Sequence, residues 1–306
     1  MPGKTILVHT LQLVSTRTDV LPWLLVILSN VGAVLMFGLA RDLFRDDRIA
    51  LYAAVLYLFT PARVLFVPVM NTVTPVFALA FGWLVMRWLV TGRGFYAAVA
   101  GVALYVLVFF EPLPLVIGLL FATLVVAAMA RNEVDFRRFL GQTAVMILIF
   151  VAVAITVYAA TGFHIGRAFG QIRQHAVEFN RSAGRPYRVW ALANPVEFVF
   201  AAGPAQFVLA AVAGPSAWRS NGRFRQRLTV PIVATSVGLF AVLIATDLIG
   251  INRGEVARLW IFLACFFQLP AAYICGVLGS RAVAAVLAIT LLQVCLATAV
   301  IGFVLP

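Results

Sequence analysis

Residues 161–194 read TGFHIGRAFGQIRQHAVEFNRSAGRPYRVWALAN and form the one long polar segment in a chain that is otherwise mostly apolar. The segment holds two of the three histidines and five arginines. Long apolar runs precede and follow it, so we expect it to lie outside a bilayer that the neighbouring runs cross. If the protein performs chemistry, this segment is expected to form one wall of the site.

The first half of this segment has the periodicity of an amphipathic helix. Ile165, Phe169, Ile172, Ala176 and Phe179 recur every three or four residues, while most polar side chains fall elsewhere on the helix surface. A helix with such an apolar stripe and a charged opposite face lies flat in the headgroup layer of a membrane. We therefore predict an interfacial helix here.

The second half of the segment is predicted to return the chain to the membrane. Residues 182–184, Ser-Ala-Gly, end the helix, and Tyr187 and Trp190 are suited to the aromatic belt at the bilayer boundary. Residues 194–197 are predicted to start the next helix, with asparagine as N-cap, proline at the first position and glutamate at the third.

The composition excludes a soluble globular protein. Of the 306 residues, 63% are hydrophobic and 11% are charged, and the mean hydropathy is +1.04. The chain is therefore predicted to be an all-α, polytopic membrane protein with a single transmembrane domain over residues 1–306. The net charge of +12 is assigned to membrane topology and anionic lipid headgroups, and nucleic acid is not an expected partner. Cys265, Cys275 and Cys295 lie in apolar runs and indicate neither a disulfide nor a metal site.

Ten apolar runs, each of about 20 residues, are predicted to cross the membrane. They lie at 22–40, 49–67, 72–90, 95–110, 114–130, 139–159, 196–215, 228–248, 257–278 and 282–304.

The arginines predict the orientation of these spans. One set of short loops carries thirteen arginines and the alternate set carries eight, five of them in residues 161–194. The positive-inside rule places the first set in the cytosol and the long loop on the outer side. Residues 1–21 would then also lie outside, which is less usual for an uncleaved N-terminus. A missing preceding span would explain it, either because the chain is an N-terminally truncated product or because its start is assigned too late.

Residues 33–61, AVLMFGLARDLFRDDRIALYAAVLYLFTP, resemble a recurring piece of bacterial membrane glycosyltransferases of the GT-C superfamily. The family pattern is a span that ends in A-R-x-L-F, a short basic turn, and then R-x-A-x-x-A-A-x-L-Y with a proline at the outer end. The matching residues are Ala40, Arg41, Leu43, Phe44, Arg48, Ala50, Ala53, Ala54, Leu56, Tyr57 and Pro61. Residues 254–260, GEVARLW, resemble an outer-end segment of such proteins.

This resemblance implies an all-helical protein of the bacterial inner membrane that transfers a sugar from a polyprenyl-phosphate carrier to an acceptor on the outer side. The implied partners are the polyprenyl-phosphate-linked sugar and membrane lipids. No cofactor is required by the pattern, although Mg²⁺ or Mn²⁺ is a possible aid to the leaving phosphate. The acidic residue that the family carries in its first outer loop has no counterpart here, and an amide, Asn71, stands at the second acidic position.

Glu111 is the leading candidate for the carboxylate that would deprotonate the acceptor hydroxyl. It interrupts 36 otherwise apolar residues, 95–130, and lies between prolines in a predicted turn. An acid at such a depth requires a partner. The alternatives are that Glu111 reaches the interface, or that it pairs with an arginine for purely structural reasons.

Arg253 and Arg258 are the candidate phosphate ligands, because guanidinium forks contact phosphate oxygens at two points. Asn252 is predicted to cap the helix that follows and Glu255 to be its third-position partner, and a helix N-terminus also favours an anion. A structural pair between Arg258 and Glu255, three residues apart, is an equally good interpretation.

The remaining substrate-binding candidates are Asn71, Arg63, His164, His175 and Glu178. Arg63 follows the second span and is expected either to reach a phosphate or to snorkel to the surface. The two histidines and Glu178 lie on the long loop. The pair His175–Glu178 lacks a third ligand, so no metal site is predicted and a solvated helix face is favoured.

Two further functions stay open at this stage. A carrier of lipids or solutes would need a polar path through the bilayer centre, and the middle of most spans offers only threonine, serine, glutamine and glycine. A non-catalytic or truncated GT-C-like scaffold is supported by the amide at Asn71 and by the missing first loop. Glycosyl transfer remains the leading hypothesis.

Overall fold

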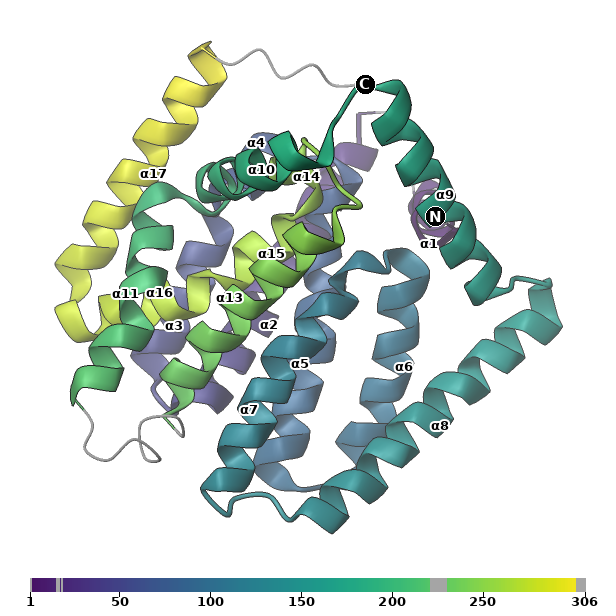
Figure 1. The fold of residues 1–306 in the computed structure, drawn as a ribbon, viewed down its shortest axis with the longest axis horizontal. Coiled ribbons are helices and arrows are strands. Elements are labelled where there is room, and N and C mark those ends of the chain that lie inside the picture. The colour runs from purple at the N-terminus through teal and green to yellow at the C-terminus, as the bar shows by residue number, and fades with distance from the viewer. Residues whose placement is uncertain (1, 15–16, 18, 221–229, 301–306) are drawn as a thin grey trace.

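The computed structural model describes residues 2–14, 17, 19–220 and 230–300, and within these residues all regular structure is helical (Figure 1). The predicted all-α membrane architecture is therefore confirmed. The helices are α1 (Pro2–Val14), α2 (Leu21–Phe44), α3 (Asp47–Leu58), α4 (Pro61–Phe66), η1 (Met70–Thr72), α5 (Thr74–Thr91), α6 (Gly94–Phe110), η2 (Leu113–Ile117), α7 (Gly118–Ala130), α8 (Phe136–Thr161), α9 (Ile165–Ser182), α10 (Tyr187–Ala202), α11 (Pro204–Ser220), α13 (Pro231–Ile249), α14 (Val256–Leu259), α15 (Ile261–Phe266), α16 (Gln268–Leu278) and α17 (Ser280–Val300).

Eight helical segments in the described part of the chain are long and apolar enough to cross a membrane. A ninth candidate is the pair α10 and α11, which meet at an angle of 102°, and α6 is a shorter apolar helix. These segments correspond to the ten predicted spans, of which residues 228–229 of the eighth and 301–304 of the tenth lie outside the described residues. The seventh span is wrong as a straight helix at 196–215, because Gly203 adopts a φ of +93° and breaks it.

The segments differ in how deeply they are buried. The span Ile261–Leu278, made of α15 and α16, is 83% buried and lies at the centre of the bundle. Phe267 lies within this span, and the rings of Phe198, Phe207 and Phe240 pack against it with centroids 5.0–5.7 Å from its own. The outer helices expose many large apolar side chains. We expect lipid to cover them, because lipid tails are as apolar as these side chains.

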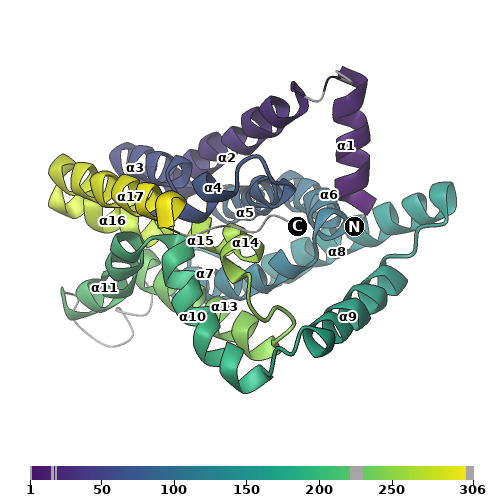
Figure 2. The ribbon, with the colours of Figure 1, turned by 90° about the horizontal axis from the view of Figure 1, so that it is seen from above.

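Helices α8 and α9 extend to one side of the bundle, away from α17 (Figure 1, Figure 2). Helix α8 packs against α6, and none of its residues is buried. The contact with α6 is close because Gly101 has no side chain. A methyl group at this position would lie 2.4 Å from the carbonyl oxygen of Met146 on α8.

We expect Gly101→Ala to destabilise the protein by about 1–3 kcal/mol, because the added methyl group must push α8 away from α6. The unfolding temperature in detergent should fall by several degrees. Gly141→Ala on α8 is the matched control, since no atom lies within 4 Å of the added methyl group. Equal unfolding temperatures for the two variants would contradict the α6–α8 contact.

Candidate functional site

The chain between α13 and α14 is not helical, and it lies beside the end of the long polar segment. Helix α13 ends at Ile249, and Gly250, Gly254 and Glu255 all adopt left-handed conformations, with φ values of +62°, +75° and +57°. Backbone carbonyls in such a segment have no helical partners, so other groups must satisfy them when they lie within a membrane protein.

Side chains mainly from residues 180–194 satisfy these carbonyls. Each of the carbonyl oxygens of residues 248 and 250–253 accepts a hydrogen bond from one side chain. The donors are Tyr187 Oη to Leu248 (3.0 Å), Arg253 Nε to Gly250 (3.1 Å), Asn180 Nδ2 to Ile251 (2.8 Å), Asn194 Nδ2 to Asn252 (3.1 Å) and Arg185 Nη1 to Arg253 (2.7 Å). The main structural role of residues 180–194 is therefore to hold the end of α13 and the non-helical residues 250–254, which we call the unwound segment.

Two predicted helix caps are wrong for this reason. Helix α10 begins at Tyr187, so Asn194 lies within it, and the side chain of Asn194 binds the unwound segment. Helix α14 follows Glu255, so Asn252 does not cap it. The demand of unpaired backbone groups outweighed the local capping pattern at both positions.

Both aromatic residues predicted for the interfacial belt pack on the unwound segment. A methyl group at Gly250 would lie 2.5 Å from the ring of Tyr187, and one at Gly254 would lie 2.9 Å from the ring of Trp190. Both glycines are therefore required for close approach as well as for their backbone conformation.

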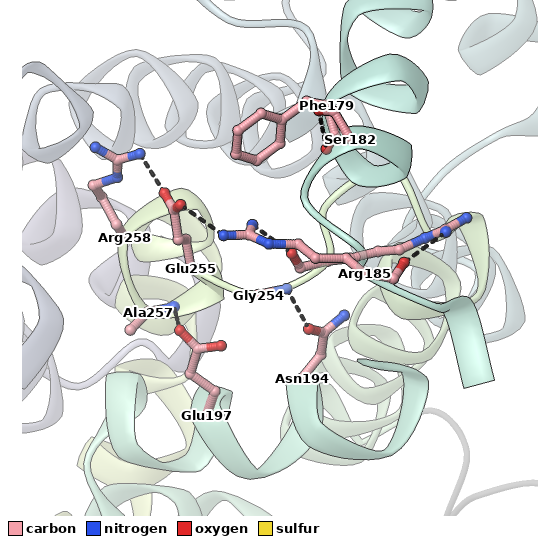
Figure 3. A network of polar contacts seen from close by, with 10 residues as sticks. Phe179, Ser182, Arg185, Asn194, Glu197, Gly254, Glu255, Ala257 and Arg258 are labelled. Carbon is pink, nitrogen blue, oxygen red and sulfur yellow. Dashed lines mark hydrogen bonds and ion pairs between the residues drawn. The ribbon is translucent and has the colours of Figure 1, made fainter. Parts of the chain in front are cut away.

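Two guanidinium groups, those of Arg185 and Arg258, contact Glu255 (Figure 3), and a third, that of Arg253, contacts backbone carbonyls nearby. The carboxylate of Glu255 accepts from Arg185 Nη2 at 3.1 Å and from Arg258 Nη2. Arg253 Nη1 donates to the carbonyl oxygen of Arg185 at 3.0 Å. The guanidinium of Arg185 lies 4.8 Å from the ring centroid of Phe179, which holds it by a cation–π contact. The interpretation of Glu255 and Arg258 as an i, i+3 ion pair is confirmed.

Sequence reasoning missed two acidic residues and one basic residue of this region. Glu197 Oε1 accepts a hydrogen bond from the backbone N–H of Ala257 at 3.2 Å, and Asp247 Oδ1 accepts from Asn194 Nδ2 at 3.0 Å. Arg185, one of the five arginines of the long polar segment, binds Glu255. Asp247 could have been found as an acid at the end of an apolar run, whereas nothing in the sequence connects Arg185 with Glu255.

Glu111 is buried, with 8% of its surface exposed, and its partner is Lys4 rather than an arginine. The carboxylate lies 2.9 Å from Lys4 Nζ and accepts a hydrogen bond from Thr74 Oγ1 at 2.8 Å. Lys4 Nζ also lies 5.7 Å from the ring centroid of Phe110. Helix α1 therefore supplies the counter-ion that the depth of Glu111 requires.

Asn71 lies between Glu111 and the arginines. Its Oδ1 is 3.4 Å from Lys4 Nζ, and its Nδ2 is 3.5 Å from the carbonyl oxygen of Arg258. These contacts are long for hydrogen bonds, but they place Asn71 beside both groups. The structure thus places Asn71 beside Lys4, the partner of Glu111, and beside the backbone of Arg258, whose guanidinium pairs with Glu255. No contact joins the side chain of Arg253 to Glu111 or Asn71 in the described residues.

Arg63 lies apart from this group and does not snorkel to the surface. Only 4% of its surface is exposed, and it donates to Ser29 Oγ at 3.0 Å, to the carbonyl oxygen of Leu58 at 2.9 Å and to Asn30 Oδ1. Its guanidinium lies 4.8 Å from the ring centroid of Tyr57. Arg63 therefore fixes the contact among α2, α3 and α4.

The predicted amphipathic helix is present as α9, and it ends at Ser182 as expected. Asn180 is its only buried residue, so neither its apolar face nor its polar face packs deeply on the bundle. His164 caps the helix by accepting from the N–H of Arg167, and His175 and Glu178 lie on exposed positions. In the residues that the structure describes, no three His, Cys, Asp or Glu side chains form a metal-binding group.

We expect Lys4→Met to destabilise the protein by about 1–3 kcal/mol, because it leaves the buried carboxylate of Glu111 without its cation. The double variant Lys4→Met/Glu111→Gln should recover most of this loss, because no charge then stays buried. Unfolding temperatures of the single and double variants in detergent measure the coupling. Additive effects would show that the two residues do not form an ion pair.

Arg185→Ala should loosen the unwound segment, because it removes donors to the carbonyl oxygen of Arg253 and to Glu255. Hydrogen exchange of the backbone amides in residues 248–258 should become about tenfold faster, the effect of losing roughly 1.4 kcal/mol of local stability. Arg188→Ala is the control, since Arg188 is exposed and forms no hydrogen bond in the described part of the chain. The interpretation fails if both variants exchange alike.

A scan against models of protein families, a search of curated proteins and a search of solved structures found no match to this chain. The ion-paired carboxylate of Glu111 and the amide of Asn71 lie beside the backbone of Arg258, whose guanidinium pairs with Glu255.

Proposed function

We propose that the protein is a membrane glycosyltransferase that transfers a sugar from a polyprenyl-phosphate carrier to an acceptor on the outer side of a bacterial plasma membrane. One observation carries the proposal: Glu111, Asn71 and Arg258 come from three distant parts of the sequence and lie together. Glycosyl transfer from a phosphate carrier needs such a combination of a carboxylate and cationic groups.

The arginines provide the phosphate site in this proposal. Arg258 donates through Nη2 to Glu255, and its other N–H groups have no partner in the described residues. Arg253 likewise leaves its Nη2 group unused. These N–H groups suit the oxygens of a phosphate, for which Arg185 supplies further positive charge.

Glu111 acts as the base in the proposed reaction. The oxygen of the acceptor hydroxyl attacks the anomeric carbon of the sugar, and its proton passes to the carboxylate of Glu111. The bond between the anomeric carbon and the phosphate oxygen breaks, and the polyprenyl phosphate leaves with the electron pair. Lys4, 2.9 Å from this carboxylate, orients it and adds positive charge beside the leaving phosphate.

The orientation of the chain is part of the proposal. The arginine-rich short turns would face the cytosol, and residues 161–194 would lie outside. Helix α9 would lie in the outer headgroup layer, because its apolar side chains Phe169 and Phe179 are exposed. The polyprenyl chain would then approach the arginines from the lipid.

A non-catalytic scaffold is the second candidate function, and one observation favours it. Glu111 and Glu255 already have cationic partners within the protein, and a satisfied ion pair needs no ligand. A scaffold with this site would bind the phosphate of a lipid carrier without turnover. Measurements of binding and turnover on the same variants separate the two functions.

Proteoliposomes that contain the protein should consume polyprenyl-phosphate-linked hexose or pentose donors and release polyprenyl phosphate. Arg258→Gln should weaken donor binding by about tenfold, the effect expected from losing one charge-assisted contact. Glu111→Gln should retain donor binding and lower turnover by a factor of 100 or more, roughly the contribution of a general base. Arg173→Gln, on the exposed surface of α9, is the control.

Binding without turnover for any donor in the panel would favour the scaffold. Neither binding nor turnover, or a Glu111→Gln variant with full turnover, would contradict the proposed enzyme.

A further inference from the structure

A cavity of about 540 Å³ lies at the other end of the bundle. Val90, in its wall, comes just before α6, whereas Glu111 directly follows the last residue of α6. A helix of 17 residues is about 25 Å long, so the cavity is separate from the site described above. Its volume is in the range of pockets that hold small ligands.

The wall of this cavity is mainly apolar. Met86, Leu89, Leu124, Ala128 and Ile232 line it from α5, α7 and α13. Tyr273 on α16 also lines it, and its hydroxyl has no hydrogen-bond partner among the described residues. A ligand that fills this space must therefore carry a hydrocarbon part.

The ends of α2 and α7 add charged side chains to the same wall. Asp42 accepts from Trp83 Nε1 at 3.0 Å and from Arg87 Nη1 at 3.1 Å, so its charge is matched. Arg131 Nη2 lies 2.7 Å from Glu133 Oε2. This hydrogen bond holds the pKa of Glu133 below its usual range against the effect of desolvation, so the pair persists at neutral pH.

Arg45 is the cation of the cavity wall that takes part in neither the Asp42–Arg87 pair nor the Arg131–Glu133 pair. The lining holds two guanidiniums, Arg45 and Arg131, and two carboxylates, Asp42 and Glu133. Asp42 pairs with Arg87, which is not a lining residue, and Glu133 pairs with Arg131, so Arg45 is the lining charge outside these ion pairs. The guanidinium of Arg45 forms no hydrogen bond or ion pair in the described residues. It is exposed and therefore accessible to a ligand.

Arg45 lies at the end of α2. Its φ is +54°, and its backbone N–H donates to the carbonyl oxygen of Arg41 at 2.8 Å, so it is the left-handed C-cap of this helix. Arg45 lines the cavity from this capping position.

We propose that this cavity binds an anionic membrane phospholipid, with the phosphate at Arg45 and part of an acyl chain along the apolar wall. The arginine-rich turns at this end suit a leaflet rich in anionic headgroups. The proposal does not depend on glycosyl transfer, because it uses none of the residues assigned to that reaction.

Native mass spectrometry of the purified full chain in detergent tests the proposal. The protein is delipidated and then mixed with phosphatidylglycerol or with phosphatidylcholine at equal concentration. We expect tighter binding of phosphatidylglycerol, and about tenfold weaker binding in Arg45→Ala, because one charge-assisted contact is lost. Arg41→Ala is the matched control, since Arg41 lies on the same turn, pairs with Asp47 and does not line the cavity.

A second pair of variants tests the cavity itself. Ala128→Phe places a ring in the cavity and should abolish specific phosphatidylglycerol binding, whereas Val126→Phe adds the same ring to the exposed face of α7 and should not. Unfolding temperatures identify any variant that fails to fold, and Arg45→Ala then decides the outcome because it changes no buried group.

Equal binding of the two lipids, or unchanged phosphatidylglycerol binding in Arg45→Ala, would overturn the proposal. A third arm replaces phosphatidylglycerol with polyprenyl phosphate, which shares the anionic phosphate but has a different chain. Clear preference for polyprenyl phosphate would also overturn the proposal and assign the cavity to the carrier lipid.

Discussion

The carbonyl groups of residues 248–253 are the constraint on which the outer end of this protein depends. Lipid offers no hydrogen bonds, so backbone that leaves the helical path must find donors within the protein. Five of these carbonyls accept a hydrogen bond from a side chain. Four of the five donors lie in residues 180–194, and the fifth is Arg253. The positions of α9 and α10, and of the arginines between them, follow from this requirement.

Charged side chains within the bundle and at this end also have partners within the protein. Glu111 has Lys4 and Thr74, Glu255 has Arg185 and Arg258, and the isolated guanidinium of Arg63 has Ser29, Asn30 and a carbonyl oxygen. Each ion pair either joins helices that are distant in the sequence or lies at a break between two helices. Charges that look like catalytic candidates in the sequence are therefore also structural, and a ligand must compete with existing partners.

The sequence predicted elements whose determinants are local. Apolar runs predicted where the membrane-spanning segments lie, although the segments at 49–67 and 257–278 each consist of more than one helix. The three- and four-residue spacing of apolar side chains predicted α9, and Ser182 to Gly184 predicted its end. The sequence did not predict the features that depend on contacts between distant segments. The cap pattern around Asn194 was overruled by the carbonyl of Asn252 and the N–H of Gly254, and no local pattern connects Lys4 with Glu111.

The existing partners of each arginine determine whether it can bind a ligand. Arg185 lies between aromatic rings and donates to both a carbonyl and a carboxylate, so its removal from these partners would expose the unwound segment. Arg258 has a single side-chain partner, Glu255, which Arg185 would still hold if Arg258 turned toward a phosphate. Arg258 can therefore change partners at little structural cost, and Arg185 cannot. A phosphate site at this end of the bundle would depend on Arg258 for binding and on Arg185 to keep Glu255 in place.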